Sequence, residues 1–155
     1  VRPGKPNGAA SSFFSGIIRE PLAGEPSVCP VSADVSHPVS SPRATVEGLM
    51  AIYECTREAY GGRTAMNLPA LNVTVQEMLD ALERVAGPAT RARVRFEHND
   101  TIAGIVSRWP KGSTAVRANR LGLHAEKTFD DIIRQYIADA QASPNAAQTL
   151  KGYNS

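Results

Sequence analysis

The sequence predicts an α/β fold of helices and short strands, and three segments carry that prediction. Residues 75–86 and 129–141 repeat apolar side chains with the 3.6-residue period of a helix that buries one face. Residues 91–96 (RARVRF) alternate arginine with apolar side chains, which is the period of a half-buried strand. With 155 residues, 42% of them hydrophobic and 21% charged, the chain is long enough to bury a core of its own.

The N-terminal part is predicted to hold one helix, over residues 12–20, after a loop (3–10) with two prolines and two glycines. Apolar side chains recur in this helix at helical spacing: Phe13, Phe14, Ile17 and Ile18. Pro21 is expected to end the helix, because proline lacks the N–H that a continuing helix needs. Residues 21–42 hold five prolines, which predicts extended, turn-rich chain with one or two short strands.

A longer helix is predicted over residues 42–60. Ser41 can cap its N-terminus, Pro42 suits the first helical position, and Gly61 with Gly62 can end it. One face of this helix is apolar, and we expect it to point inward: Val46, Leu49, Met50, Tyr53 and Tyr60.

Short strands are then expected over residues 64–68 and 91–96, on either side of the helix at 75–86. That helix opens with a capping box, in which Thr74 and Glu77 satisfy each other's backbone N–H groups. Its C-terminus is expected at Gly87, which is followed by a proline.

The C-terminal third is predicted to be helical up to residue 141. Asn99 or Asp100 caps a short helix, and a helical turn within 117–123 is closed by Gly122. Thr128 caps the helix at 129–141, which has the best amphipathic pattern in the chain. The tail over residues 143–155 is rich in polar residues, proline and glycine, and we expect it to be disordered.

Charge and motif spacing exclude several classes of protein. Seventeen basic and fifteen acidic residues give a net charge of +2, and the basic residues are spread along the chain rather than grouped for nucleic acid. No apolar run is long enough to span a bilayer, so we expect no membrane partner. The three histidines share no metal-ligand spacing with one another or with Cys29 and Cys55, so no metal is expected.

The order of segments resembles the C-terminal half of extended short-chain dehydrogenases, in the NAD-dependent epimerase/dehydratase superfamily. Three stretches carry the resemblance, which covers residues 1–141: VRPGKPNGAASSFFSGIIREPL (1–22), NLPALNVTVQEMLDAL (67–82) and RANRLGLHAEKTFDDIIRQYI (117–137). The first stretch, with SSPRATV from residue 40, is most similar to dehydrogenases of D-erythronate. The start, Val1-Arg2-Pro3-Gly4, is neither an initiator methionine nor a secretory leader, and we expect a fragment of a longer chain.

The resemblance implies a Rossmann sheet that binds NAD, and a catalytic tyrosine whose pKa is lowered by a lysine in a YxxxK motif. This chain has no glycine-rich dinucleotide fingerprint, and the residues four after Tyr53, Tyr60 and Tyr136 are Arg57, Thr64 and Ala140. Residues 1–142 are therefore expected to be a substrate-binding lobe of a cytoplasmic enzyme, with 143–155 as its tail. The chain alone is expected neither to bind NAD nor to catalyse oxidation.

The resemblance also implies that the loop at the N-terminus and the start of the 42–60 helix face one cleft. Arg2 and Pro3 are then expected at the cofactor. Asn7, Ser12 and Ser41 are expected to hydrogen-bond substrate hydroxyls.

Arg43 is expected to bind the substrate carboxylate, because a guanidinium gives that contact both charge and geometry. The alternative is structural, with Arg43 paired to Asp34 or Glu47 and Ser41 serving only as a helix cap.

Nucleotide-sugar members of the superfamily usually carry an acidic pair where this chain has residues 39–43 (VSSPR). The exchange favours a small anionic sugar acid such as D-erythronate, oxidised at the hydroxyl carbon next to the carboxylate. Two alternatives are a nucleotide-sugar epimerase or dehydratase, and a stand-alone binding module without catalysis. Self-association into a homo-oligomer is also expected, through the loop over 1–10 and the apolar helix from Phe13 to Ile18.

Overall fold

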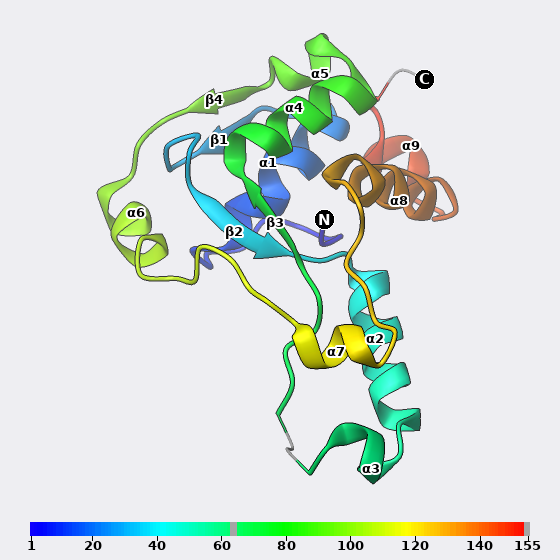
Figure 1. The fold of residues 1–155 in the computed structure, drawn as a ribbon. Coiled ribbons are helices and arrows are strands. Elements are labelled where there is room, and N and C mark those ends of the chain that lie inside the picture. The colour runs from blue at the N-terminus through cyan, green and yellow to red at the C-terminus, as the bar shows by residue number, and fades with distance from the viewer. Residues whose placement is uncertain (63–64, 154–155) are drawn as a thin grey trace.

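Three helices lie at the centre of the molecule in the computed structural model, which describes residues 1–62 and 65–153 (Figure 1). They are α1 (Ser12–Leu22), α4 (Val75–Ala86) and α8 (Phe129–Gln141). Helix α4 packs against both of the others and supplies the fully buried side chains of Leu79 and Leu82. The α/β fold with short strands that the sequence predicted is confirmed.

Two small sheets flank these helices. Strand β1 (Ser27–Cys29) pairs in parallel with β4 (Val94–Phe96), and β2 (Ser36–Val39) pairs antiparallel with β3 (Leu71–Thr74). Helix α1 contacts β1, and β3 runs directly into α4. The chain thus folds its N-terminal 40 residues against segments that follow much later in the sequence.

The helices with the clearest caps have the predicted bounds. In α4 the Thr74 hydroxyl accepts from the N–H of Glu77, whose carboxylate in turn accepts from the N–H of Thr74, 2.7 Å away. Thr128 and Asp131 form the same reciprocal pair at the start of α8. Helix α6 (Asp100–Val106) is capped by the side chain of Asn99, and α7 (Val116–Arg120) is the helical turn expected near Gly122.

Several predicted boundaries are wrong. Helix α1 continues through Pro21 to Leu22. A proline this close to the end of a helix removes only one hydrogen bond, and the N–H of Ala23 still bonds to the carbonyl of Arg19. The helix over 42–60 is two helices, α2 (Pro42–Glu54) and α3 (Arg57–Tyr60). They separate at Cys55, which is extended, and the Thr56 side chain then caps α3.

The two predicted strands also need correction. Thr64 of the strand over 64–68 lies outside the described residues, and residues 65–68 are irregular; the strand is at Leu71–Thr74 instead. Residues 91–96 begin in a helical turn, α5 (Pro88–Arg91), so the strand is reduced to Val94–Phe96. No helix in the described part of the chain is long and apolar enough to cross a membrane.

The C-terminal tail was expected to be disordered, and its described part is instead folded against the body. Residues Ala146–Thr149 form α9, which contacts α8. Farther on, the N–H of Gly152 donates to the carbonyl of Leu22, and its carbonyl accepts from the hydroxyl of Thr90, 3.1 Å away. Backbone hydrogen bonds, together with Leu150 and Tyr153, whose side chains pack on the core, therefore hold this segment.

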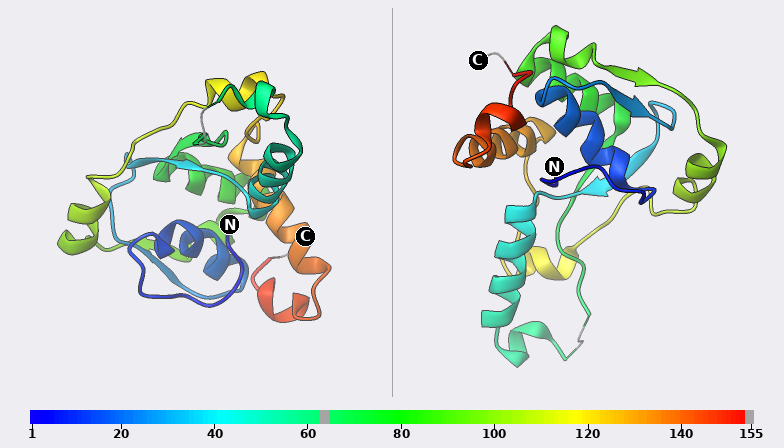
Figure 2. Two further views of the ribbon diagram at one scale, coloured as in Figure 1. Left: turned by 90° about the horizontal axis from the view of Figure 1, so that it is seen from below. Right: turned by 180° about the vertical axis from the view of Figure 1, so that it is seen from behind.

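The exposed apolar surface lies on α2, not on α1. Phe13 and Phe14, which were expected to form an exposed surface for self-association, are 9% and 8% exposed and belong to the core. The apolar face of α2, defined here as Val46, Leu49, Met50 and Tyr53, was expected to point inward and is instead 54–91% exposed. Helices α2 and α3 extend away from the central helices, and nothing in the described chain covers this face (Figure 2).

We expect the 155-residue chain to self-associate through the apolar face of α2, because soluble monomers rarely leave such a surface open. Replacing Leu49 and Met50 together by lysine should reduce the mass measured by light scattering at high concentration. The same double variant should keep its Tm, since both side chains are more than half exposed. A wild-type chain that stays monomeric at high concentration would contradict this expectation.

Candidate functional site

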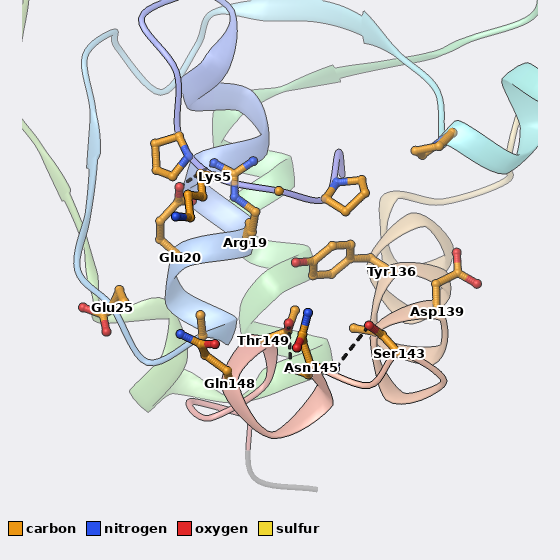
Figure 3. Close-up of a pocket in the computed structure, with 16 residues that line it drawn as sticks. Lys5, Arg19, Glu20, Glu25, Tyr136, Asp139, Ser143, Asn145, Gln148 and Thr149 are labelled. Atoms are coloured by element: carbon orange, nitrogen blue, oxygen red, sulfur yellow. Dashed lines mark hydrogen bonds and ion pairs between the residues drawn. The ribbon is translucent and has the colours of Figure 1, made fainter.

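A cavity of about 730 Å³ lies between the N-terminal loop, the end of α1, and helices α8 and α9 (Figure 3). Residues Pro3–Pro6 form one wall, and Pro42 at the start of α2 reaches the same space. Cavities of this size suit small molecules. The loop and the α2 start therefore do meet, as the resemblance implied.

An ion pair between neighbouring residues of α1 forms one side of the cavity. Arg19 Nη2 lies 2.5 Å from Glu20 Oε1, and the two side chains are only 7% and 17% exposed. Arg19 also donates from Nη1 to the carbonyl of Arg2, 3.1 Å away. The N–H of Arg2 in turn donates to the hydroxyl of Ser15, so Arg19 and Ser15 together fasten the N-terminal loop to α1.

Tyr136 enters the cavity from α8 and faces this ion pair (Figure 3). The residue is 6% exposed, and its hydroxyl has no hydrogen-bond partner among the described residues. Burial raises the pKa of Tyr136; the Glu20 charge raises it further, and the Arg19 charge opposes both. The hydroxyl is therefore protonated at neutral pH and able to donate.

The rest of the lining is mainly apolar, with a few polar groups of mixed charge. Lys5 adds a cation, while Glu25 and Asp139 add carboxylates, and the side-chain amides of Asn145 and Gln148 come from the C-terminal segment. The described lining contains neither histidine nor cysteine. A mainly apolar wall with a few polar groups is typical of sites that bind small molecules.

Some of the predicted site residues lie at this cavity and some beside it. Pro3 lines it, and Arg2 lies next in the chain with its carbonyl bound to Arg19. Asn7 and Ser12 are brought together, since the N–H of Asn7 donates to the Ser12 hydroxyl over 3.4 Å. Neither is part of the cavity wall.

Ser41 and Arg43 occupy the start of α2 and already have partners. The Ser41 side chain is buried and accepts from the N–H of Ala44 as a helix cap, while its own N–H donates to Glu126 Oε1, 2.9 Å away. Arg43 forms an ion pair with Asp139 of α8, so its partner is neither of the two acidic residues proposed from the sequence. Both side chains of that pair are about half exposed, and Asp139 lines the cavity. A contact of Arg43 or Ser41 with substrate remains a prediction.

Sequence reasoning missed the residues that form most of the cavity wall. Tyr136 was tested only for a YxxxK motif and otherwise falls in the apolar pattern of its helix, and Asn145 and Gln148 belong to the tail that was expected to be disordered. The Arg19–Glu20 pair carried a usable signal: two charged residues directly after Ile17 and Ile18 in an otherwise apolar helix. Charges in such a position are buried only when they are paired.

The described residues do not fit a dinucleotide. A dinucleotide site needs a parallel sheet in which a strand leads through a glycine-rich turn into a helix. The described chain instead has two sheets of two strands each, and β1 is followed by a proline, a bend at Val31 and a turn at residues 33–34 rather than a helix. NAD binding therefore cannot be derived from this part of the protein.

Comparison with known proteins gives close relatives but no matching protein-family model. The chain is 48% identical over 140 residues to the D-erythronate dehydrogenase of Cupriavidus necator, and 39% identical over 137 residues to that of Haemophilus influenzae. These alignments cover 90% and 88% of this chain, but only 43% and 44% of the relatives. The chain thus spans less than half the length of either relative.

Solved structures agree on the fold. A nucleoside-diphosphate-sugar epimerase from Agrobacterium tumefaciens superposes with a TM-score of 0.86 at 43% identity, over 89% of this chain and 40% of its own. L-threonine 3-dehydrogenase from Trypanosoma brucei superposes with a TM-score of 0.76 at 20% identity, over 89% of this chain and 42% of its own, which shows the fold alone. Taken with the sequence relatives, these matches show that the chain is similar to part of the D-erythronate dehydrogenases and that its fold matches the C-terminal portion of Rossmann-like epimerases and dehydrogenases.

Proposed function

We propose that this chain is the substrate-binding part of a longer NAD-dependent dehydrogenase that oxidises a small sugar acid such as D-erythronate. The observation that carries the proposal is the sequence identity of 48% and 39% to two D-erythronate dehydrogenases, over 90% and 88% of this chain. NAD and the catalytic residues would be held by the part of the protein that this chain does not span. We place such an enzyme in the cytoplasm.

The cavity supports a binding role for this chain. Its mixture of a buried ion pair, a neutral tyrosine hydroxyl and side-chain amides suits a small hydroxylated molecule, because hydroxyl groups both donate and accept hydrogen bonds. Lys5 provides a cation on the loop for a carboxylate, and Arg43 provides another at the rim if Asp139 releases it. Asn7 and Ser12 lie on the same loop and are proposed as further hydroxyl contacts.

The proposal is tested by following NADH formation spectroscopically with D-erythronate as substrate. The longer protein that contains this chain should reduce NAD in proportion to enzyme and substrate. The 155-residue chain alone should form no NADH at any concentration, because it contains neither the dinucleotide fingerprint nor the YxxxK motif. NADH formation by the repurified chain alone would contradict the assignment of a purely binding role.

A second candidate is a nucleotide-sugar epimerase, which the 43% identity to the Agrobacterium protein of that name favours. The stretch at residues 39–43 (VSSPR) argues against it, because an acidic pair is usual there in nucleotide-sugar enzymes. The same longer protein should therefore leave UDP-sugars unchanged. Epimerisation of a UDP-sugar without oxidation of D-erythronate would replace the first proposal by the second.

A further inference from the structure

Two polar atoms in the cavity are buried without a hydrogen-bond partner in the described chain: Tyr136 Oη and Glu20 Oε2. Native proteins satisfy the large majority of their buried polar atoms, so each exception calls for a reason. Both atoms belong to residues that line the same cavity, from opposite sides of it, α8 and α1 (Figure 3). They do not bond to each other, so each needs a partner from elsewhere.

The Glu20 carboxylate is held in place with one oxygen engaged and the other open. Oε1 accepts from Arg19, which is itself fixed by its bond to the Arg2 carbonyl. Gly16 lies one helical turn earlier, and a Cβ at that position would come within 3.2 Å of Glu20 Oε2. The glycine therefore leaves room for the carboxylate to lie back over α1 and keep Oε2 at the cavity.

The two open atoms have complementary hydrogen-bonding roles. The Tyr136 hydroxyl can donate, whereas the Glu20 carboxylate can only accept. An alcohol is the group that fits both at once, because its oxygen accepts from Tyr136 while its proton is donated to Glu20. A carboxylate would be repelled by Glu20, so the charged end of a ligand belongs elsewhere in the cavity, toward Lys5.

We propose that Tyr136 and Glu20 form a subsite that recognises one hydroxyl group of a polyhydroxylated acid. The identity of that acid rests on the function proposed above. The subsite itself is inferred from the two unpartnered atoms. A site built to bond a hydroxyl rejects analogues that lack it, because its own polar groups then stay buried and unpaired. The subsite would therefore set specificity for hydroxylation and take no part in the chemical step.

The main test is Tyr136→Phe in the longer dehydrogenase, with three substrates: D-erythronate and its 3-deoxy and 4-deoxy analogues. Wild type should prefer D-erythronate over one of the two analogues, and Tyr136→Phe should raise the KM for D-erythronate about three- to tenfold, as expected for one lost hydrogen bond. The KM for the disfavoured analogue should not change, so discrimination between the two should fall by the same factor. Equal discrimination in wild type and variant would overturn the proposal.

Stability provides a second readout, because Tyr136→Phe removes a buried hydroxyl that has no partner in the protein. The Tm should therefore stay the same or rise. A clear fall in Tm would show that the hydroxyl is bonded within the protein, and would overturn the subsite. Tyr53→Phe, on the exposed face of α2, is the matched control and should change neither KM nor Tm.

Glu20→Gln tests the acceptor, with Glu47→Gln as its control, because Glu47 is exposed on α2 and is not part of the cavity wall. Only the change at Glu20 should weaken hydroxyl discrimination. Calorimetric binding of erythritol, which has the hydroxyls but no carboxylate, separates the subsite from the reaction. If D-erythronate is not oxidised but Tyr136→Phe still weakens erythritol binding, the proposed function fails and the subsite stands. If D-erythronate is oxidised with unchanged discrimination in the variant, the subsite fails and the function stands.

Discussion

Arg19→Ala is expected to lower the free energy of unfolding of the 155-residue chain by about 3–5 kcal/mol, the usual cost of breaking a buried ion pair. The substitution leaves the Glu20 carboxylate, only 17% exposed, without the guanidinium that lies 2.5 Å from it. Urea denaturation measures the loss directly, and an unchanged m-value would show that the native and unfolded states are otherwise comparable.

The same substitution should also loosen the cavity wall. Arg19 donates to the Arg2 carbonyl, and that bond fastens the loop that lines the cavity with Pro3–Pro6. We therefore expect faster hydrogen exchange at the amides of Arg2 and Asn7, which donate to the hydroxyls of Ser15 and Ser12, in Arg19→Ala than in wild type. Arg19→Lys should restore part of the stability but not the slow exchange, because a single ammonium group cannot reproduce the two-sided contact of a guanidinium.

A double-mutant cycle tests whether loss of the Arg19–Glu20 ion pair causes the expected fall in stability. Replacing Arg19 by methionine and Glu20 by leucine together should cost less than Arg19→Met alone, since no uncompensated charge is left in the interior. Arg95→Ala is the control: Arg95 pairs with Glu97 at 3.6 Å, both are about two-thirds exposed, and its loss should change stability little. A cost for Arg19→Ala as small as that of the control would show that the pair is not effectively buried.

The helices that the sequence predicted best are those whose ends are determined locally. Thr74 and Thr128 each start a helix by bonding an acidic residue three positions later, so a window of a few residues contains the whole signal. The strand pairs carry no such signal. Ser27 of β1 lies opposite Val94 of β4, and the register of two three-residue strands depends on how α1 packs rather than on their own sequences.

The spacing of apolar residues also does not predict which segment packs on an apolar helix face, or where the polar end of a side chain lies. The pattern on α2 is amphipathic, yet Leu49 and Tyr53 are exposed because no part of the described chain packs on them. Tyr136 fits the apolar stripe of α8 with its ring, while its hydroxyl lies at the cavity. An apolar pattern in the sequence predicts that the ring is buried but does not predict where the hydroxyl lies. The sequence therefore placed Tyr136 in the core and missed its position in the candidate site.

The C-terminal segment is ordered, and its amino-acid composition does not predict this. Gly152 packs on the turn after α1, where a Cβ would come within 2.5 Å of the Pro21 carbonyl oxygen and of Gly24 Cα. Gly24 has a φ of +84°, which other residues rarely adopt. The contact between the two glycine backbones buries little apolar side chain, and the apolar contacts of this segment come from Leu150 and Tyr153, which pack on the core. Two apolar residues in a polar stretch are too few for composition to predict order, although the backbone is closely packed.

Gly152→Ala should therefore release the C-terminal segment. The contacts below 3 Å are with backbone atoms, which cannot move aside as a flexible side chain would. Displacement breaks the bond from the Gly152 N–H to the Leu22 carbonyl and leaves the Thr90 hydroxyl, 2% exposed, without the acceptor of its proton, while Arg93 still donates to its oxygen. An unsatisfied buried donor costs about 1–3 kcal/mol, so the free energy of unfolding should fall by about that amount.

Hydrogen exchange followed by mass spectrometry tests this release, since the amides of residues 146–152 should be protected in wild type and exchange quickly in Gly152→Ala. Gly104→Ala is the matched control: Gly104 lies within α6 with open space around it, and alanine there should be neutral or stabilising by up to about 1 kcal/mol. Because Asn145 and Gln148 line the cavity, release of the segment should also weaken erythritol binding in the longer dehydrogenase. Unchanged protection in Gly152→Ala would mean that the close approach of Gly152 to Gly24 does not hold the segment, and that α9 remains docked on α8 through its own contacts.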